Sequence, residues 1–471
     1  MGRNVAGRPV LIVGSILVLA AGCAGPAERE AREAIADPGA PGPYASRPAA
    51  EAPDPAPLPV LGEDATLEDY LANAAMNNPR LSAALAEWRA AGELAPQART
   101  LPDPVLSYQL EAMQDRRQHQ VMVTQALPWF GKLDLRAEAA EAEAEAARQR
   151  YEAEKLAVVR EVRDAYDEYY YLSRAIVVVG ENRDLVKYLE EVVRARYAAS
   201  AAGHPDVIRA QVELGKLDDE LRTRVDSRSA AAARLNAVLN RPAEAPLPWP
   251  RALAEEPVEA SDGRLLEILR ESNPELKALD SQVAREERMI RLAEKDYYPD
   301  LMLGAGYMRE QMSGGGEDGV MAMVGATLPI WRAKYAAGVR EAEWRHDAAV
   351  RRRADRENTL GAEVKMVLYR VRDAARKINL YRDTLLPKAR EALKATEASF
   401  RVGQATFTDL VDAQRIFLEF QLAGERALAD HAQRRAELEM LVGRALPRAA
   451  AEPVAGVEGP QTKNENQEGE K

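Results

Sequence analysis

Asn78-Pro79-Arg80-Leu81 returns later in the chain as Asn273-Pro274-Glu275-Leu276. Other motifs repeat in the same order: Ala126-Leu127-Pro128 returns as Thr327-Leu328-Pro329, and a tryptophan follows each copy. Residues 66–242 and 263–445 therefore follow one plan. A repeat of about 200 residues is too long for a solenoid unit. We expect a duplicated half, whose two copies occupy equivalent places around an axis.

Each copy predicts the same order of elements: a helical segment, two strands, a very long helix, a turn and a shorter helix. The first copy, 63–250, holds a hairpin at 103–128 and a long helix at 134–202. The second copy, 251–446, holds a hairpin at 299–329 and a long helix at 334–401. Apolar residues recur every three or four positions in the long helices, as in coiled coils. Such thin rods need neighbouring helices to bury this stripe.

The hairpins have features of membrane strands. Leu106, Tyr108 and Leu110 alternate with polar residues, and each strand has about the 9–11 residues that a tilted transmembrane strand needs. A soluble hairpin packed on a helix is the alternative, so the membrane interpretation also depends on the N-terminal signal and the duplication. Aromatic residues flank the hairpins at one end, where a membrane-interface girdle would lie: Trp129, Phe130, Trp331, Tyr297 and Tyr298.

The N-terminus predicts export from the cytoplasm. Residues 1–22 combine a basic start with a short apolar run and read as a signal peptide. Small residues precede Cys23, which predicts a lipoprotein signal whose cysteine carries the lipid anchor, palmitate included. A plain secretory signal with an incidental cysteine is the alternative. Residues 23–62 read as a Pro/Ala-rich tether, and the polar residues 447–471 as a disordered acidic tail.

The composition excludes several classes of site. Cys23 is the only cysteine, so neither a disulfide within the chain nor a thiolate metal cage can form. The net charge of −11, with no basic cluster, argues against nucleic acid as a partner. The sequence has no nucleotide-binding loop and no His-Glu-x-x-His motif, and its four histidines lack ligand spacing. We expect no enzyme activity, no cofactor and no bound metal.

One chain supplies too few strands to close a membrane barrel. The smallest transmembrane barrels have about eight strands, and an open edge cannot face lipid. The long helical walls favour a wide channel, hence three chains rather than two. The sequence therefore predicts a mainly α chain with a membrane β-barrel. A homotrimer would form a roughly 12-stranded β-barrel, and its long helices would form an α-helical tube continuous with that barrel.

Over about residues 64–446, the chain resembles the TolC family of outer-membrane channels from tripartite efflux pumps. The most specific stretch is similar to the family's helix–turn–helix at the periplasmic tip: Phe400-Arg401-Val402-Gly403-Gln404-Ala405-Thr406-Phe407-Thr408-Asp409-Leu410-Val411-Asp412-Ala413. Residues 125–132 resemble the strand exit of the family's metal-efflux branch. The first copy departs from the tip pattern, since it has Ala199-Ser200-Ala201 where Val-Gly is expected.

The resemblance implies two sites at the tip. Docking of a periplasmic adaptor would involve the two turns: Val402, Gly403 and Gln404 in the second copy, and Ala199, Ser200 and Ala201 in the first. A gate would be formed by Asp409 and Asp412, with Asp206 from the first copy and Phe400 at the position of a latch tyrosine. An N-terminal helix cap is the alternative role of Asp409, and both roles can coexist.

The resemblance implies a lipid-anchored outer-membrane exit duct that extends into the periplasm. It would passively conduct drugs or metal ions delivered by an inner-membrane transporter and its adaptor. A type I-like protein secretion channel is one alternative, and a non-transporting coiled-coil envelope lipoprotein is another. Seven of the 12 methionines lie in or beside the hairpins, and we expect them to pack against lipid or neighbouring strands, with Cu(I) ligation as the alternative: Met113, Met122, Met302, Met308, Met312, Met321 and Met323.

Overall fold

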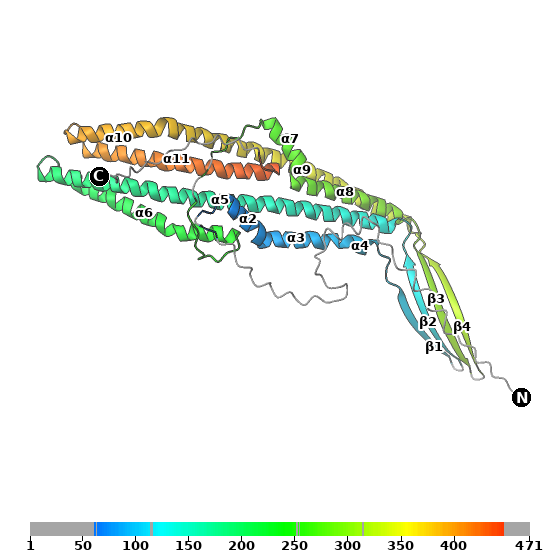
Figure 1. The fold of residues 1–471 in the computed structure, drawn as a ribbon. Helices are drawn as coiled ribbons and strands as arrows, with labels where there is room; N and C mark the ends of the chain where they lie inside the picture. Colours follow the sequence, from blue (N-terminus) through cyan, green and yellow to red (C-terminus); the bar gives the residue numbers. More distant parts are fainter. Residues whose placement is uncertain are drawn as a thin grey trace, which may run out of the picture. The chain divides into compact units, whose positions relative to one another are not determined.

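A computed structural model describes residues 61–62, 64–113, 116–250, 253, 255–312 and 315–446, which belong to one unit, Pro59–Lys471 (Figure 1). The expected signal peptide, lipidation site Cys23, nearly all of the tether and the tail lie outside the described residues. Among the described helices, none is both long enough and apolar enough to cross a bilayer.

The order of elements is repeated, which confirms the duplicated plan (Figure 1). The first copy runs α2 (Leu67–Asn77), α3 (Pro79–Gly92), α4 (Leu94–Arg99), β1 (Val105–Met113), β2 (Arg116–Leu127), α5 (Lys132–Ala198) and α6 (His204–Val238). The second copy runs α7 (Asp262–Ser272), α8 (Pro274–Lys295), β3 (Leu301–Met312), β4 (Gly315–Ala326), α9 (Arg332–Leu380), η1 (Tyr381–Leu385), α10 (Leu386–Arg401) and α11 (Phe407–Val442).

The first Asn-Pro motif joins the start of its copy to the end. Asn78 caps α3, since its Oδ1 accepts hydrogen bonds from the N–H groups of Arg80 (2.9 Å) and Leu81 (3.4 Å). Pro79 fills the first helical position, where a missing N–H is harmless. The Nδ2 of Asn78 donates to the carbonyl of Val238, the last residue of α6, over 2.8 Å.

The second motif repeats this arrangement. The Oδ1 of Asn273 accepts from the N–H of Leu276 over 3.0 Å, and its Nδ2 donates to the carbonyl of Leu441 over 2.8 Å. Gly443 ends α11 with a φ of +86°, and a Cβ there would lie 2.6 Å from the Cα of Asn273. Only glycine fits both the left-handed backbone and this close approach.

The second long helix differs from the uninterrupted helix expected over 334–401. The structure divides it into α9, a π-helical turn η1 and α10. Pro387 lies at the start of α10 and has no N–H for the usual helical bond. The N–H of Leu386 instead donates to the carbonyl of Tyr381, which makes the wider π turn. The first long helix, α5, has no proline and continues without a break.

The long helices pack along one another. Helix α5 lies against α6, α8 and α11, and α9 lies against α8 and α11. Small side chains on α5, including the fully buried Ala137 and Ala146, let a neighbouring helix approach closely. Larger apolar side chains form separate cores along the bundle. One core, at the junction of α5 and α6 with α10 and α11, contains Leu189, Val193, Val207, Leu393, Phe400, Phe407 and Leu410.

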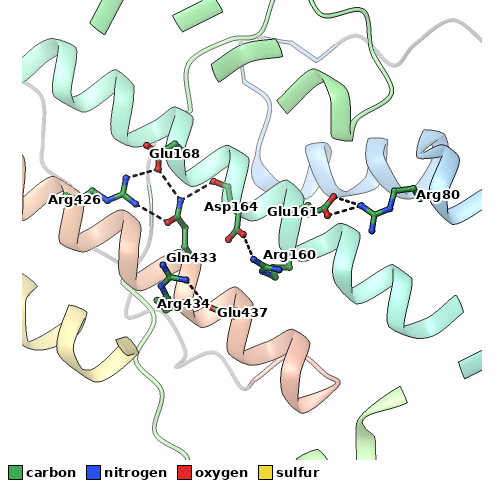
Figure 2. Close-up of polar contacts among 9 residues, drawn as sticks. All are labelled: Arg80, Arg160, Glu161, Asp164, Glu168, Arg426, Gln433, Arg434 and Glu437. Atoms are coloured by element: carbon green, nitrogen blue, oxygen red, sulfur yellow. Dashed lines mark hydrogen bonds and ion pairs between the residues drawn. The ribbon is translucent and has the colours of Figure 1, made fainter. Parts of the chain in front are cut away.

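Polar side chains join the two copies along α5 and α11 (Figure 2). Arg426 of α11 contacts Glu168 of α5 over 2.7 Å and donates to the Oε1 of Gln433 over 3.1 Å. The Nε2 of Gln433 donates in turn to the backbone carbonyl of Asp164 over 3.2 Å. Part-buried pairs of this kind fix the register of two helices more than they stabilise them. Further contacts along α5 are Arg80–Glu161, Arg163–Glu439 and Asn182–Gln421.

The four strands form one antiparallel sheet in the order β1-β2-β3-β4. Both hairpins are continuous with each other, because β2 pairs with β3 along its whole length, from Arg116↔Met312 to Leu127↔Leu301. Strands β1 and β4 are the edges of this sheet. Side chains alternate between the two faces of such a sheet, so residues paired in register share a face.

Candidate functional site

Two helix turns lie at one end of the helical bundle, one in each copy. In the first, α5 ends at Ala198, and Ser200 has a φ of +58° before α6 begins. In the second, α10 ends at Arg401, and Gly403 has a φ of +81°. The closing bonds correspond too: Ala201 N–H donates to Arg196 O, and Gln404 N–H donates to Ser399 O, both over 2.8 Å. The two turns therefore have the same backbone geometry, although the first copy has Ala199-Ser200-Ala201 where Val-Gly was expected.

The residues expected to dock an adaptor are placed at these turns, and all six are exposed. Val402 has 71% of its surface exposed, which is unusual for an apolar side chain and leaves it free for a partner. Ser200 occupies a left-handed conformation that costs a non-glycine residue about 1–2 kcal/mol. The first turn is therefore the more strained of the two.

Asp409 caps α11. Its Oδ2 accepts hydrogen bonds from the Thr406 hydroxyl (2.7 Å) and the Thr406 N–H (2.9 Å), while the N–H of Asp409 donates to the Thr406 hydroxyl. This is a capping box. The side-chain hydrogen bond and then the backbone bond lower the pKa of Asp409 below its ordinary value. The carboxylate is exposed, so the cap leaves it open to solvent.

The other two acidic residues expected at the gate are paired with arginines of their own helices. Asp412 lies 3.7 Å from Arg415, and Asp206 lies 3.8 Å from Arg209. Arg209 also donates to the hydroxyl of Thr408 over 2.7 Å, which joins α6 to α11. The two carboxylate–arginine contacts are long and at least partly exposed to solvent, so each holds its carboxylate only weakly.

Phe400 departs from the expectation that it lines the gate. Its side chain is only 4% exposed and packs in the tip core, with its ring 5.8 Å from that of Phe407. Arg196 covers the ring from the α5 side and donates to the Phe400 carbonyl. The same guanidinium donates to the carbonyl of Ala201 over 3.2 Å. Sequence reasoning missed Arg196, because no local pattern indicates a contact between residues of different copies.

The expected interface aromatics lie where the strands meet the helices. Trp129 stacks on Tyr298 with ring centroids 5.4 Å apart, and Tyr297 lies against Tyr335. Phe130 and Trp331 are largely exposed. Their clustering at this junction supports a membrane-interface role.

A charge cluster around the buried Lys132 lies beside these rings, and sequence reasoning missed it. The Nζ of Lys132 lies 2.9 Å from Asp300 and 3.1 Å from Asp296. Asp300 also accepts a hydrogen bond from the N–H of Trp129 over 2.8 Å. A lysine at a helix N-terminus opposes the helix dipole, and this was the available signal that an acidic partner lies nearby. The cluster joins the exit of β2 to the entry of β3.

Comparison with known proteins places this arrangement in a family. The sequence profile described as "Outer membrane efflux protein" matches residues 70–241 and 265–444. The chain belongs to the outer membrane efflux protein family. It is an outer-membrane efflux channel protein, and the two matched stretches fall within the two copies of the repeat. In the described residues, no group of three or more His, Cys, Asp or Glu side chains is arranged to hold a metal ion.

The relatives agree with this assignment. The cobalt-zinc-cadmium resistance protein CzcC of Cupriavidus metallidurans is 22% identical over 402 residues, covering 82% of this chain and 93% of CzcC. A membrane protein from Pseudomonas aeruginosa matches in structure with a TM-score of 0.70 and 22% identity, covering 85% of this chain and 99% of that one. The outer membrane protein VceC from Vibrio cholerae matches with a TM-score of 0.69 and 18% identity, covering 80% and 96%. At these identities, the structural likeness shows the fold.

Proposed function

We propose that this efflux protein works as a homotrimer, the exit duct of a tripartite system. Three copies would join edge to edge, β4 of one to β1 of the next, and close a barrel in the outer membrane. The helices would continue this barrel into the periplasm as a tunnel. The duct would be passive, because transport energy would come from an inner-membrane transporter.

The open sheet is the observation that carries this proposal. One face of the sheet is apolar and exposed, with Val320 at 87% exposure and Leu106 at 69%. Both edge strands have unpaired backbone groups on their outer sides. Neither feature is tolerable in an isolated chain, and lipid and neighbouring copies would satisfy both. A coiled-coil spacer would have no use for such a sheet.

The helix turns are proposed as the docking and gating end. Adaptor hairpins would meet the exposed turn residues Val402, Gly403 and Gln404, together with 199–201 of the first copy. Asp409 and Asp412, with Asp206 nearby, would place carboxylates around the periplasmic entrance. These carboxylates would attract cations and repel anions there. Phe400 and Arg196 would support the turns from inside the tip.

We propose that Cys23 carries the lipid anchor and that the cargo consists of drugs or metal ions. The similarity to a cobalt-zinc-cadmium resistance protein supports metal ions among the cargo. A secretion duct for proteins would need a protein-exporting transporter as its partner, and no observation favours it here.

A planar-bilayer recording tests the proposed channel. Purified protein should produce stepwise conductance increments with a preference for cations, whereas the same preparation dissociated by heat should produce none. Absence of conductance from intact assemblies would contradict the proposal. Docking is tested by Gly403→Trp, which should abolish cellular resistance while assembly persists. Gly403→Asn is the control, since asparagine tolerates the left-handed backbone.

A further inference from the structure

The strand register places the hairpin methionines on one face of the sheet. Met122 pairs with Gly306, which pairs with Met321 on β4. Met308 pairs with Gln120 and Gly319, and Met302 pairs with Ala126 and Gly325. Met323 pairs with Gly304 and lies two residues from Met321 on β4, so it is on the same face. Met113 and Met312 both pair with Arg116, so their positions also belong to this face of the sheet.

This methionine face is the polar face of the sheet. Its other members include Ser107, Gln109, Glu111, Gln118 and Gln120. The opposite face contains apolar residues: Leu106, Leu110, Val121, Val123, Leu303, Val320 and Val324. On β4 from Gly319 to Ala326, residues of the methionine face are half-buried and those of the apolar face exposed, which indicates that the methionine face is concave there. In this register the methionines lie on the polar face and not the apolar one, which favours the part of the expectation that has them packed against neighbouring strands over the part that has them packed against lipid.

Methionine side chains pack over glycines of the neighbouring strand, where a larger residue would crowd them. A Cβ on Gly304 would lie 3.2 Å from the Cε of Met323, and one on Gly319 would lie 3.6 Å from the Cε of Met308. Gly306 lies between Met122 and Met321 in the register, and it has no side chain to separate theirs; a Cβ there would lie 2.6 Å from the Val121 carbonyl oxygen and 3.3 Å from the Cβ of Met122. The Sδ of Met308 accepts a contact from the Nε2 of Gln118 at 2.7 Å. At least this sulfur is accessible to a polar neighbour.

Thioethers on a wet, concave face suit one class of ligand. Sulfur of methionine is a soft, neutral ligand that selects Cu(I)-like ions, whereas carboxylate and carbonyl oxygens suit harder cations. A methionine that served only to fill space could lie equally well on the apolar face, so packing alone does not account for its place on the polar face. Here the described sheet methionines are on the polar side, opposite glycine. Each side chain has three rotatable bonds with which to reach a shared ion.

We propose that Met122, Met308 and Met321, which surround Gly306, form a binding site for soft monovalent cations of the Cu(I) class, with Met302 and Met323 as neighbouring ligands. This inference rests on the proposed function, because the methionine face lines the channel only if the sheet closes into a barrel. The site would pass such ions outward along the barrel wall. Such a site would bind one class of cargo, soft monovalent cations, in preference to hard divalent cations.

Silver(I) is the probe, because it shares the ligand preference of Cu(I) and does not change oxidation state. The full-length protein carries Cys23→Ser, which removes the only thiol in the chain. Bound silver is measured by equilibrium dialysis in chloride-free buffer. M122L/M308L/M321L should bind silver at least tenfold more weakly than its parent. The control M76L/M289L/M366L changes three methionines of the helices and should bind as the parent does. Leucine conserves side-chain volume, so the sheet should tolerate these changes.

A second readout needs no triple variant. Methionine methyl groups labelled with ¹³C in the parent protein should shift in NMR spectra when silver is added, and single Met→Leu variants assign those signals to the sheet. Excess Zn²⁺ should not reverse the shifts. The proposal is overturned if the parent binds no silver, if the sheet and control triples bind equally, or if Zn²⁺ displaces the silver. Bilayer conductance of the same samples tells a failure of the silver site from a failure of the proposed channel. A parent protein that conducts but binds no silver contradicts only the silver site. A parent protein that does not conduct contradicts the proposed function.

Discussion

The guanidinium of Arg196, near the end of α5, lies 4.6 Å from the ring centroid of Phe400, near the end of α10. Arg196 also donates to the carbonyls of Phe400 and Ala201. One side chain therefore contacts both tip turns, which come from different copies of the repeat. A cation over an aromatic ring contributes roughly 0.5–2 kcal/mol.

Replacement of Arg196 by alanine should loosen both turns together. We expect amide hydrogen exchange over 199–203 and 401–405 to speed up roughly fivefold, which corresponds to about 1 kcal/mol. Lysine at this position should have an intermediate effect, because it keeps the charge and loses the planar fork. Arg194→Ala is the control, since Arg194 pairs with Glu190 of its own helix. Faster exchange in one turn alone would show that Arg196 does not couple them.

The Asn273 cap predicts a stability difference between two substitutions. Asn273→Ala removes the cap and the buried bond to Leu441, for an expected loss of roughly 2–3 kcal/mol. Asn273→Asp keeps the cap acceptor but replaces the donor to Leu441 with a negatively charged oxygen, so its loss of stability comes from the Leu441 side of the contact. Denaturant unfolding measures both, and Asn78→Ala gives the matched change in the first copy. If Asn273→Asp is as stable as the parent, the bond to Leu441 contributes nothing.

Asp167 predicts a loss of stability as the pH rises from 3.8 to about 8. Burial, and then the nearby charge of Asp164, raise its pKa from 3.8 to about 8. The folded chain therefore holds a proton that the unfolded chain releases between these values, so stability falls as pH rises through this window. Asp167→Asn should flatten this dependence and raise the melting temperature at pH 9 relative to the parent. Asp219→Asn, which changes an exposed carboxylate, is the control. Parallel pH profiles for parent and Asp167→Asn would contradict the prediction.

The tip carboxylates predict the selectivity of the channel. Asp409→Ala combined with Asp412→Ala, both on α11, should reduce the preference for cations in planar bilayers. Glu391→Gln, which changes an exposed carboxylate on α10, should not. Because the pKa of Asp409 lies below its ordinary 3.8, its charge should persist as the pH falls from 7 to 5 and disappear only below that ordinary value. Unchanged selectivity in the double variant would exclude these residues from the constriction.

Local pattern was enough to predict the repeat and its elements. The two Asn-Pro motifs marked the repeat, and the alternation of Leu106, Tyr108 and Leu110 with polar residues indicated a strand whose faces differ. A helix cap was expected as the alternative role of Asp409, and the structure adds its capping-box partner Thr406. These features depend on neighbours in sequence.

Contacts between distant segments escaped prediction. Arg196 and Phe400 meet only because α5 and α10 end side by side, and Lys132 meets Asp300 across the junction of two hairpins. The π turn had a visible signal in Pro387, yet the sequence alone does not decide between a kink and a wider turn. The shared face of the methionines needed the register between strands, which one strand cannot specify.

One chain supplies only part of the proposed barrel. Native mass spectrometry of protein extracted by mild detergent from its own outer membrane will show how many chains complete it. The proposal predicts a complex of three chains that dissociates on heating. A stable monomer under the same conditions would contradict it, because the two sheet edges would then need no partner.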